Sequence, residues 1–138
     1  MTKHRLISWQ NLLLIFSAII FLDRFSKIFF QDECFLIFCV RRALNSGAAF
    51  GIFPGMIWLF VLISAAVLAL TVYFWKIKEI RLPLTLIAAG TIGNLIDRLA
   101  YGIIIDLFSI AGSSSFNVAD LSLLIGAIML VIFLLKKK

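Results

Sequence analysis

The sequence predicts an integral membrane protein that is mainly α-helical, with four transmembrane helices forming one membrane-embedded domain over residues 1–138. Three observations support this fold class: 63% of the 138 residues are hydrophobic, only 14% are charged, and the apolar residues fall into four long runs. A soluble core could not bury so much apolar surface in so short a chain, whereas a bilayer can cover it. The composition therefore excludes an ordinary soluble domain.

Each apolar run has about the length of a membrane-spanning helix. Crossing the hydrocarbon layer takes roughly 17–25 apolar residues, and a segment in lipid must satisfy its own backbone groups, which makes helices the default. The expected helices cover residues 6–30, 56–75, 82–100 and 119–135. The two longer connections between them are residues 31–55 and 101–118.

The basic residues predict how these helices are oriented. The net charge is +6, and most Lys and Arg residues fall at the N-terminus, in the connection 76–81 and at the C-terminus. Because cytoplasmic loops carry the excess of Lys and Arg, both termini are expected in the cytoplasm, with 31–55 and 101–118 outside. No small-residue cleavage site follows the first apolar run, so we interpret it as an uncleaved helix.

The connection 31–55 combines a short strand pattern, "CFLIFCV", with a glycine-rich stretch typical of turns, "NSGAAFGIFPG". Its two cysteines, Cys34 and Cys39, form a disulfide if the segment faces an oxidising space, and two free buried thiols are equally consistent with the sequence. His4 is the only histidine, and no Cys/His spacing typical of a metal site occurs. We therefore expect no metal and no cofactor.

Four carboxylates interrupt the apolar pattern, namely Asp23, Asp97, Asp106 and Asp120. An isolated ionised carboxylate near hydrocarbon costs several kcal/mol, so each should be paired or functional. On the expected topology all four lie toward the outer side of the membrane. Other polar residues expected at the same depth are Asn45, Asn94, Asn117, Arg24, Lys27 and Arg98. This clustering predicts a polar site at the outer leaflet.

Taken singly, each of these residues also has a purely structural interpretation. Asp23 and Lys27 have the i, i+4 spacing of a helical ion pair. Asn94, with Asp97 and Arg98 three and four residues later, could form hydrogen bonds that fix helix packing.

The remaining residues have structural alternatives too. Asn117 could be the N-cap of the last helix, with Asp120 in its first turn against the helix dipole. Asp106 could be an ordinary acidic residue of an interfacial loop, and Gly47 could belong to a tight turn.

The chemistry open to these residues is that of carboxylates. The serines and cysteines lack a nearby histidine base, and no glycine-rich phosphate loop is present. Two aspartates brought together share one proton, so that one activates water while the other polarises a carbonyl. Asp106 and Asp120 fit this arrangement, because they come from separate elements joined by a loop that can fold back.

The chain resembles the lipoprotein signal peptidases (signal peptidase II), which are bacterial integral-membrane aspartic peptidases. The resemblance spans nearly the whole chain and rests on five blocks in order. They are "DRFSK" at 23–27, "NSGAAFGIF" at 45–53, "GNLIDR" at 93–98, "GIIIDLF" at 102–108 and "FNVAD" at 116–120.

The resemblance implies roles for particular residues. Asp106 and Asp120 would be the catalytic dyad. The residues that orient substrate and dyad would be Asn45, Asn94, Arg98 and Asn117, and those that hold the architecture near the site would be Asp23, Lys27, Asp97 and Gly47. The family fold would add a small outer β-rich cradle and a short amphipathic element between helices 1 and 2.

The resemblance also implies a substrate and a location. The enzyme would cleave prolipoproteins on the N-terminal side of a diacylglyceryl-modified cysteine, in the bacterial cytoplasmic (inner) membrane. Its partners would be the lipid-modified substrate and membrane lipids, with no nucleic acid, and we expect a monomer.

Two other functions fit some of the pattern. A small transporter or proton-conducting subunit would use acidic residues as a relay across the membrane, but here they gather on one side. A non-enzymatic assembly subunit would explain buried polar pairs, although it gives no reason for Asp106 and Asp120 to stand beside three asparagines.

Overall fold

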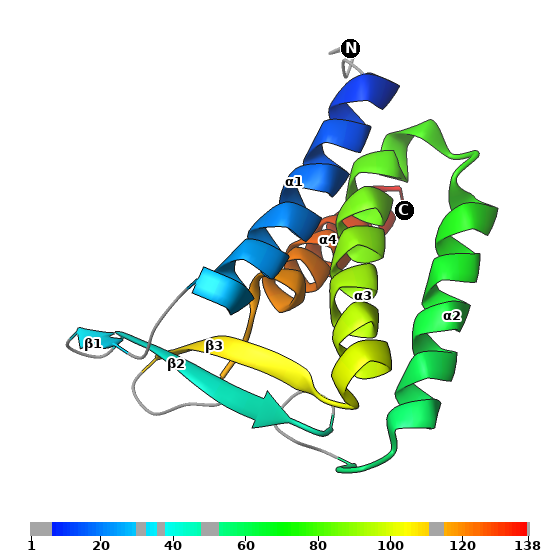
Figure 1. Ribbon diagram of the computed structural model, residues 1–138. Coiled ribbons are helices and arrows are strands. Elements are labelled where there is room, and N and C mark those ends of the chain that lie inside the picture. The colour runs from blue at the N-terminus through cyan, green and yellow to red at the C-terminus, as the bar shows by residue number, and fades with distance from the viewer. Residues whose placement is uncertain (1–6, 30–32, 36–37, 48–52, 111–114, 138) are drawn as a thin grey trace.

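The computed structural model describes residues 7–29, 33–35, 38–47, 53–110 and 115–137, and this part of the chain is mainly helical with one small antiparallel sheet (Figure 1). Its elements in order are α1 (Trp9–Phe29), β1 (Glu33–Phe35), β2 (Phe38–Asn45), α2 (Ile57–Phe74), the short 3-10 helix η2 (Lys78–Ile80), α3 (Arg81–Tyr101), β3 (Ile104–Ile110) and α4 (Val118–Lys136). The sheet lies across one end of the helices.

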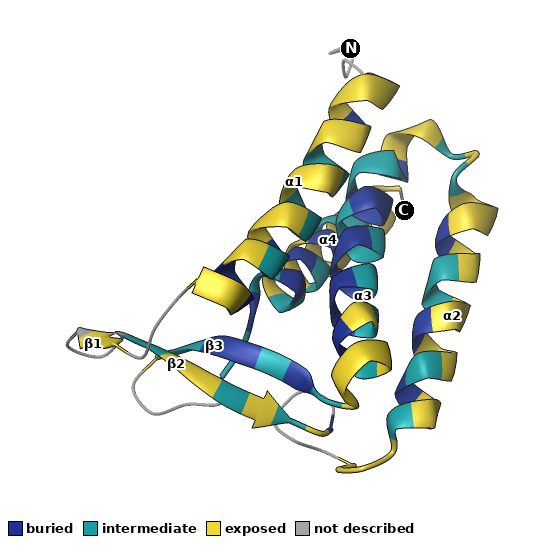
Figure 2. Cartoon of the chain, in the orientation of Figure 1, coloured by how far each residue is buried: buried dark blue, intermediate teal, exposed yellow. Residues whose placement is uncertain are grey.

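Exposed residues lie along the outer faces of the helices (Figure 2), and many of them are large apolar residues. Within the described residues, α2 and α4 are the two helices long and apolar enough to cross a membrane by length and composition. Large side chains such as Trp58 on α2 and Leu135 on α4 are about two-thirds exposed or more. An apolar surface of this kind is typical of contact with lipid rather than water.

Helix α3 is the central element and carries the most extensive buried face, with α1, α2 and α4 packed around it. Glycines bring α3 and α4 close together. A Cβ atom at Gly90 would overlap the backbone oxygen of Ala119, and one at Gly126 would lie 2.9 Å from that of Pro83. Small residues at such contacts let helix backbones approach closely, as is common between membrane helices.

The sheet has the strand order β1-β2-β3, with both pairs antiparallel. A disulfide joins Cys34 and Cys39, which face each other across the β1–β2 pair. Strand β2 then pairs with β3, so that Ala43 lies opposite Asp106. The disulfide answers the question that the sequence left open between paired and free thiols.

Gly102 allows the chain to pass directly from α3 into β3. It ends α3 in the left-handed conformation with φ of 72°, and its N–H donates to the carbonyl oxygen of Arg98 at 3.0 Å. Glycine adopts this conformation without the Cβ penalty of other residues. The tight reversal places β3, and with it Asp106, beside the end of α3.

The expected helical ranges differ from the observed ones by a few residues at most. The single strand expected around 34–40 is instead a hairpin of β1 and part of β2, and the extended segment expected after α3 is β3. The amphipathic element is expected between the first two helices, in a connection where residues 30–32, 36–37 and 48–52 lie outside the described residues. Residues 53–55 form a turn before α2.

Candidate active site

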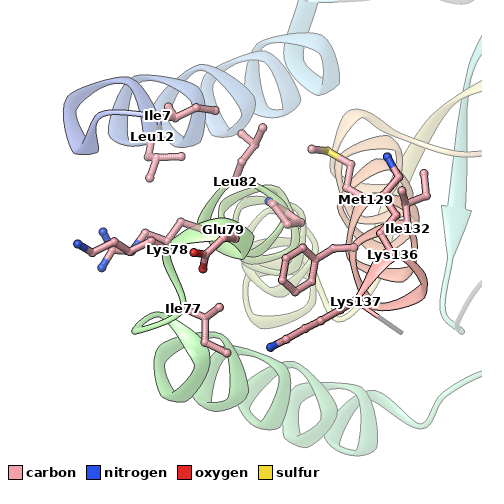
Figure 3. Close-up of a pocket in the computed structure, with 13 residues that line it drawn as sticks. Ile7, Leu12, Ile77, Lys78, Glu79, Leu82, Met129, Ile132, Lys136 and Lys137 are labelled. Atoms are coloured by element: carbon pink, nitrogen blue, oxygen red, sulfur yellow. The ribbon is translucent and has the colours of Figure 1, made fainter. Parts of the chain in front are cut away.

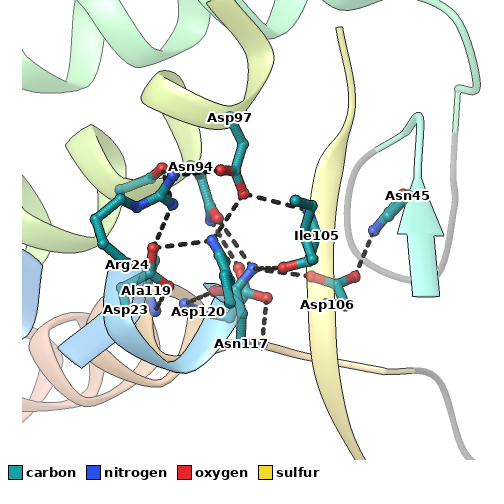
Figure 4. Close-up of polar contacts among 12 residues, drawn as sticks. Asp23, Arg24, Asn45, Asn94, Asp97, Ile105, Asp106, Asn117, Ala119 and Asp120 are labelled. Atoms are coloured by element: carbon teal, nitrogen blue, oxygen red, sulfur yellow. Dashed lines mark hydrogen bonds and ion pairs between the residues drawn. The ribbon is translucent and has the colours of Figure 1, made fainter. Parts of the chain in front are cut away.

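The polar residues gather where the C-terminal halves of α1 and α3 meet β3 and the beginning of α4 (Figure 4). Asp23 and Asp97 are fully buried, and Asp106 is 3% exposed. Asp120 is partly exposed at the edge of the same cluster. A buried carboxylate needs hydrogen-bond or ionic partners. The partners of each of these four aspartates therefore indicate its role in the site.

Asp106 is held on β3 by two neutral amides. Its Oδ2 accepts from the side-chain nitrogen of Asn45 at 3.1 Å, and its Oδ1 accepts from that of Asn117 at 2.8 Å. The pairing of β2 with β3 explains the first contact. Asn45 lies two residues along β2 from Ala43, which is opposite Asp106, so Asn45 and Asp106 are diagonal neighbours on one face of the sheet.

Asp120 occupies the first turn of α4 and forms a capping box with Asn117. The side-chain oxygen of Asn117 accepts from the backbone N–H of Asp120 at 2.8 Å, and Oδ2 of Asp120 accepts from the backbone N–H of Asn117 at 3.1 Å. The other carboxylate oxygen, Oδ1, accepts from the side-chain nitrogen of Asn94 at 2.7 Å. The N-cap interpretation of Asn117 is thus confirmed.

Asn117 and Asn94 also connect the two carboxylates. Asn117 is fully buried, and its side-chain nitrogen donates both to Asp106 and to the side-chain oxygen of Asn94, at 2.8 and 3.1 Å. A single amide therefore contacts Asp106 while capping the helix that carries Asp120. We refer to Asp106 and Asp120, held by Asn45, Asn94 and Asn117, as the amide-held pair.

Burial raises the pKa of Asp106 to about 6, and the negative charge of Asp120 acts in the same direction. The amides of Asn45 and Asn117 act in the opposite sense, because their N–H groups stabilise the ionised form. The raised pKa brings the protonation of Asp106 closer to neutral pH than that of an ordinary aspartate.

Asp23 and Asp97 are bound by cations instead. The ammonium group of Lys27 lies 2.9 Å from Asp23 and 2.7 Å from Asp97, and the Arg24 guanidinium lies 2.5 and 2.6 Å from the same two carboxylates. Lys27 is 3% exposed. These four residues form what we call the ion-pair cluster, and the expected i, i+4 pair of Asp23 and Lys27 is part of it.

The ion-pair cluster also holds the segments that carry the amide-held pair. Oδ1 of Asp23 accepts from the backbone N–H of Ala119 at 3.1 Å, next to Asp120. Oδ2 of Asp97 accepts from the backbone N–H of Ile105 at 3.2 Å, next to Asp106. Dashed lines in Figure 4 mark both contacts. The cluster therefore positions the beginning of α4 and the first part of β3.

Arg98 and Gly47 lie at the side of the site that faces α2. The Arg98 guanidinium stands over the ring of Phe60, 4.7 Å from its centroid, and donates to the backbone oxygen of Gly47 at 3.4 Å. Gly47 is buried, and its N–H donates to the side-chain oxygen of Asn45 at 2.9 Å, as in an Asx turn. Asp120 and Asp106 attract the Arg98 charge through space.

The structure brings all of the predicted site residues into this one region and adds Arg24. The sequence placed Arg24 at the right depth but gave it no role. Adjacent residues on a helix do not face each other, so its position next to Asp23 gave no signal of contact. Among the described residues, no group of three or more His, Cys, Asp or Glu side chains could hold a metal ion.

Comparison with known proteins gives the family. Residues 15–136 match the family model described as signal peptidase (SPase) II. The chain belongs to the signal peptidase II family. Family membership makes it a membrane-embedded protease and argues against the transporter and assembly-subunit alternatives.

Relatives and solved structures agree with this family. The chain is 39% identical over 119 residues to a lipoprotein signal peptidase of Syntrophomonas wolfei, covering 83% of this chain and 77% of the relative. It is 32% identical over 144 residues to one of Clostridium acetobutylicum, covering 91% and 94%. A bacterial membrane enzyme solved by the in meso method at 2.3 Å superposes with a TM-score of 0.88 at 27% identity, covering 97% of this chain and 93% of that one.

Proposed function

We propose that this signal peptidase II removes the signal peptide from prolipoproteins, cleaving on the N-terminal side of a diacylglyceryl-modified cysteine, with Asp106 and Asp120 as the catalytic pair. One observation carries the proposal. The two carboxylates come from separate elements and are held by neutral amides, and within the described residues neither forms an ion pair with Lys or Arg.

The pair would work with one shared proton. The ionised carboxylate takes a proton from a water molecule whose oxygen attacks the peptide carbonyl carbon, while the protonated carboxyl group gives its proton to the carbonyl oxygen. As the tetrahedral intermediate collapses, the carboxyl group that took the proton from water gives it to the amide nitrogen and the C–N bond breaks. The other carboxylate takes back a proton from a hydroxyl group of the intermediate, which restores the pair. The products are a new carboxyl group on the signal peptide and a free amine on the lipidated cysteine.

The asparagines would orient the pair without adding a positive charge. A cation within hydrogen-bond distance would hold a carboxylate ionised, whereas a neutral amide stabilises the ionised form less and still allows the carboxylate to take up a proton. Asn45 and Asn117 would position Asp106, and Asn94 would position Asp120. Arg98 would help to orient the substrate, from its place between the pair and Phe60.

We further propose how the enzyme sits in the bacterial inner membrane. All four helices would cross it as one domain and as a monomer, with both termini in the cytoplasm and the site toward the outer leaflet. The distribution of charge supports this orientation, because Lys78, Arg81 and Lys136 lie at the end of the helices opposite the sheet. A substrate anchored in the bilayer would reach the site at a fixed depth, which reduces the entropic cost of positioning.

The decisive experiment compares carboxylate-to-amide variants. Wild type, Asp106→Asn and Asp120→Asn would be purified in detergent and supplied with a lipidated prolipoprotein, with Glu79→Gln as a matched control at the opposite end of the protein. Mass spectrometry would locate the cut. We expect both site variants to lose activity by a factor of about 10³ or more, as for loss of general acid–base catalysis, while remaining folded and melting in one cooperative transition.

The control should cleave at the wild-type rate, and a precursor with serine in place of the modified cysteine should remain intact. Normal cleavage by either folded site variant would show that the pair is not catalytic. Cleavage at another peptide bond would overturn the proposed substrate specificity while leaving the pair as the active site.

A further inference from the structure

A cavity of about 720 Å³ lies at the end of the protein opposite the amide-held pair (Figure 3). Its walls come from the beginning of α1, the connection through η2 into α3, and the last turns of α4. None of the residues in the amide-held pair or the ion-pair cluster lines it. The cavity is thus separate from the candidate active site.

The charged part of this cavity's lining is strongly basic. Its charged lining residues are Lys78, Arg81, Lys136 and Lys137, with Glu79 as the one acidic residue. Within the described residues, none of the four cations forms an ion pair. Arg81 instead donates from Nε to the backbone oxygen of Trp75 at 2.9 Å. Four cations against one carboxylate leave the cavity with a local excess of positive charge.

The interior of the cavity is apolar. Leu12 from α1, Leu82 from α3, and Met129 and Ile132 from α4 face the space between these helices (Figure 3). Such a wall offers hydrocarbon contacts to a ligand but no hydrogen bonds. The lining therefore suits a molecule with a negatively charged head and an apolar tail.

Two other occupants match this lining less well. The beginning of a signal peptide is positively charged, so the four cations that line the cavity would repel it. Free phosphate would contact only the cations and would make no use of the apolar wall. A lipid with an anionic head group uses both parts, and basic pockets between membrane helices on the cytoplasmic side are known to bind such head groups.

We propose that this cavity binds one anionic phospholipid, with the phosphate at Lys78, Arg81, Lys136 and Lys137 and the acyl chains against the apolar wall. The bound lipid would contact α1, α3 and α4 together, which are the helices that also meet at the candidate active site. A ligand that binds only the folded arrangement stabilises it. The inference goes beyond the proposed proteolysis, and its test does not depend on cleavage.

The test measures lipid binding to delipidated protein in a neutral detergent. Native mass spectrometry and melting curves would be recorded with phosphatidylglycerol, phosphatidylcholine or glycerol phosphate. We expect one phosphatidylglycerol to remain bound per protein and to raise the melting temperature by several degrees. Equal binding of phosphatidylcholine would overturn the proposed role of charge, and an equal effect of glycerol phosphate would overturn the role of the apolar wall.

Two variants locate the site. Lys136→Gln combined with Lys137→Gln should weaken phosphatidylglycerol binding by about tenfold or more, since each cation near an anionic lipid contributes about 1 kcal/mol. Met129→Trp, which reduces the volume of the cavity without changing charge, should reduce the fraction of protein that retains lipid. Equal weakening in the control Arg41→Gln with Lys76→Gln, which removes the same charge outside the cavity, would overturn the proposal.

Discussion

The ion-pair cluster and the amide-held pair lie side by side, but their aspartates have different kinds of partner. Asp23 and Asp97 each have two cations within 3 Å. Within the described residues, Asp106 and Asp120 accept hydrogen bonds from asparagine amides and one backbone N–H. Cations strongly stabilise a carboxylate as an anion, whereas neutral amides fix its position, stabilise the anion less and still allow it to take up a proton.

We therefore expect the ion-pair cluster to stabilise the fold and the neighbouring amide-held pair to act in the reaction. The ion-pair cluster binds the backbone at Ala119 and Ile105, each next to an aspartate of the amide-held pair. Its removal should therefore damage the fold, whereas changes to the amide-held pair should damage activity. Four variant sets test this division, in order from the largest expected effect to the smallest.

Asp97→Asn should cause the largest loss of stability. The change leaves the buried Lys27 and the partly buried Arg24 with one carboxylate in place of two, and breaking a buried ion pair typically costs about 3–5 kcal/mol. Melting temperatures in detergent would measure the effect, with Asp106→Asn as the matched carboxylate-to-amide control. If Asp97→Asn melts like the wild type, the cluster does not support the fold.

The pKa of Asp106 predicts a dependence of stability on pH. This pKa is about 6 in the folded protein, against about 3.9 in an unfolded chain, so the fold binds the proton more tightly. The stabilisation is present below about pH 4 and is lost as the pH rises through 6, by up to about 3 kcal/mol. Wild type should therefore lose stability relative to Asp106→Asn between pH 4 and 7. A constant difference would show that this pKa is not raised.

Two substitutions of Asn117 separate its two functions. Serine can still cap α4 but cannot donate to both Asp106 and Asn94, whereas alanine loses the cap as well, at a cost of about 1 kcal/mol. Both variants should lose activity to a similar degree, by at least tenfold, and Asn117→Ala should melt at the lower temperature. Wild-type cleavage by Asn117→Ser would show that the cap alone accounts for Asn117.

The disulfide should have the smallest effect on the amide-held pair. Cys34 and Cys39 lie at the β1 end of β2, whereas Asn45 is at its other end and is placed by the pairing of β2 with β3. Replacing both cysteines by serine should change cleavage by no more than a few-fold. A loss as large as that of Asn45→Ala would show that the disulfide positions Asn45.

Much of the fold and of the candidate site could be predicted, because polar residues are easily recognised within apolar runs of sequence. The helices followed from the length of those runs, and Asp106 and Asp120 stood out by position and by family resemblance. Spacing also predicted the ion pair of Asp23 with Lys27, which is confirmed at 2.9 Å.

Contacts between distant segments could not be predicted in the same way. Lys27 also binds Asp97, which lies 70 residues away, and Arg24 reaches the same carboxylate across the helix interface. No local periodicity encodes such pairs. The register of β2 on β3 likewise depends on long-range packing, so the contact of Asn45 with Asp106 required the structure.

The hydrogen bond between Asp23 and Ala119 joins the first helix of the chain to the last. Ala119 follows Asp23 by 96 residues, so Asp23 lacks this partner until the ribosome has synthesised the beginning of α4. Until α4 inserts, the nascent chain has no assembled carboxylate pair. With Asp106 and Asp120 as the proposed catalytic pair, cleavage requires that α4 has already packed against α1 and α3.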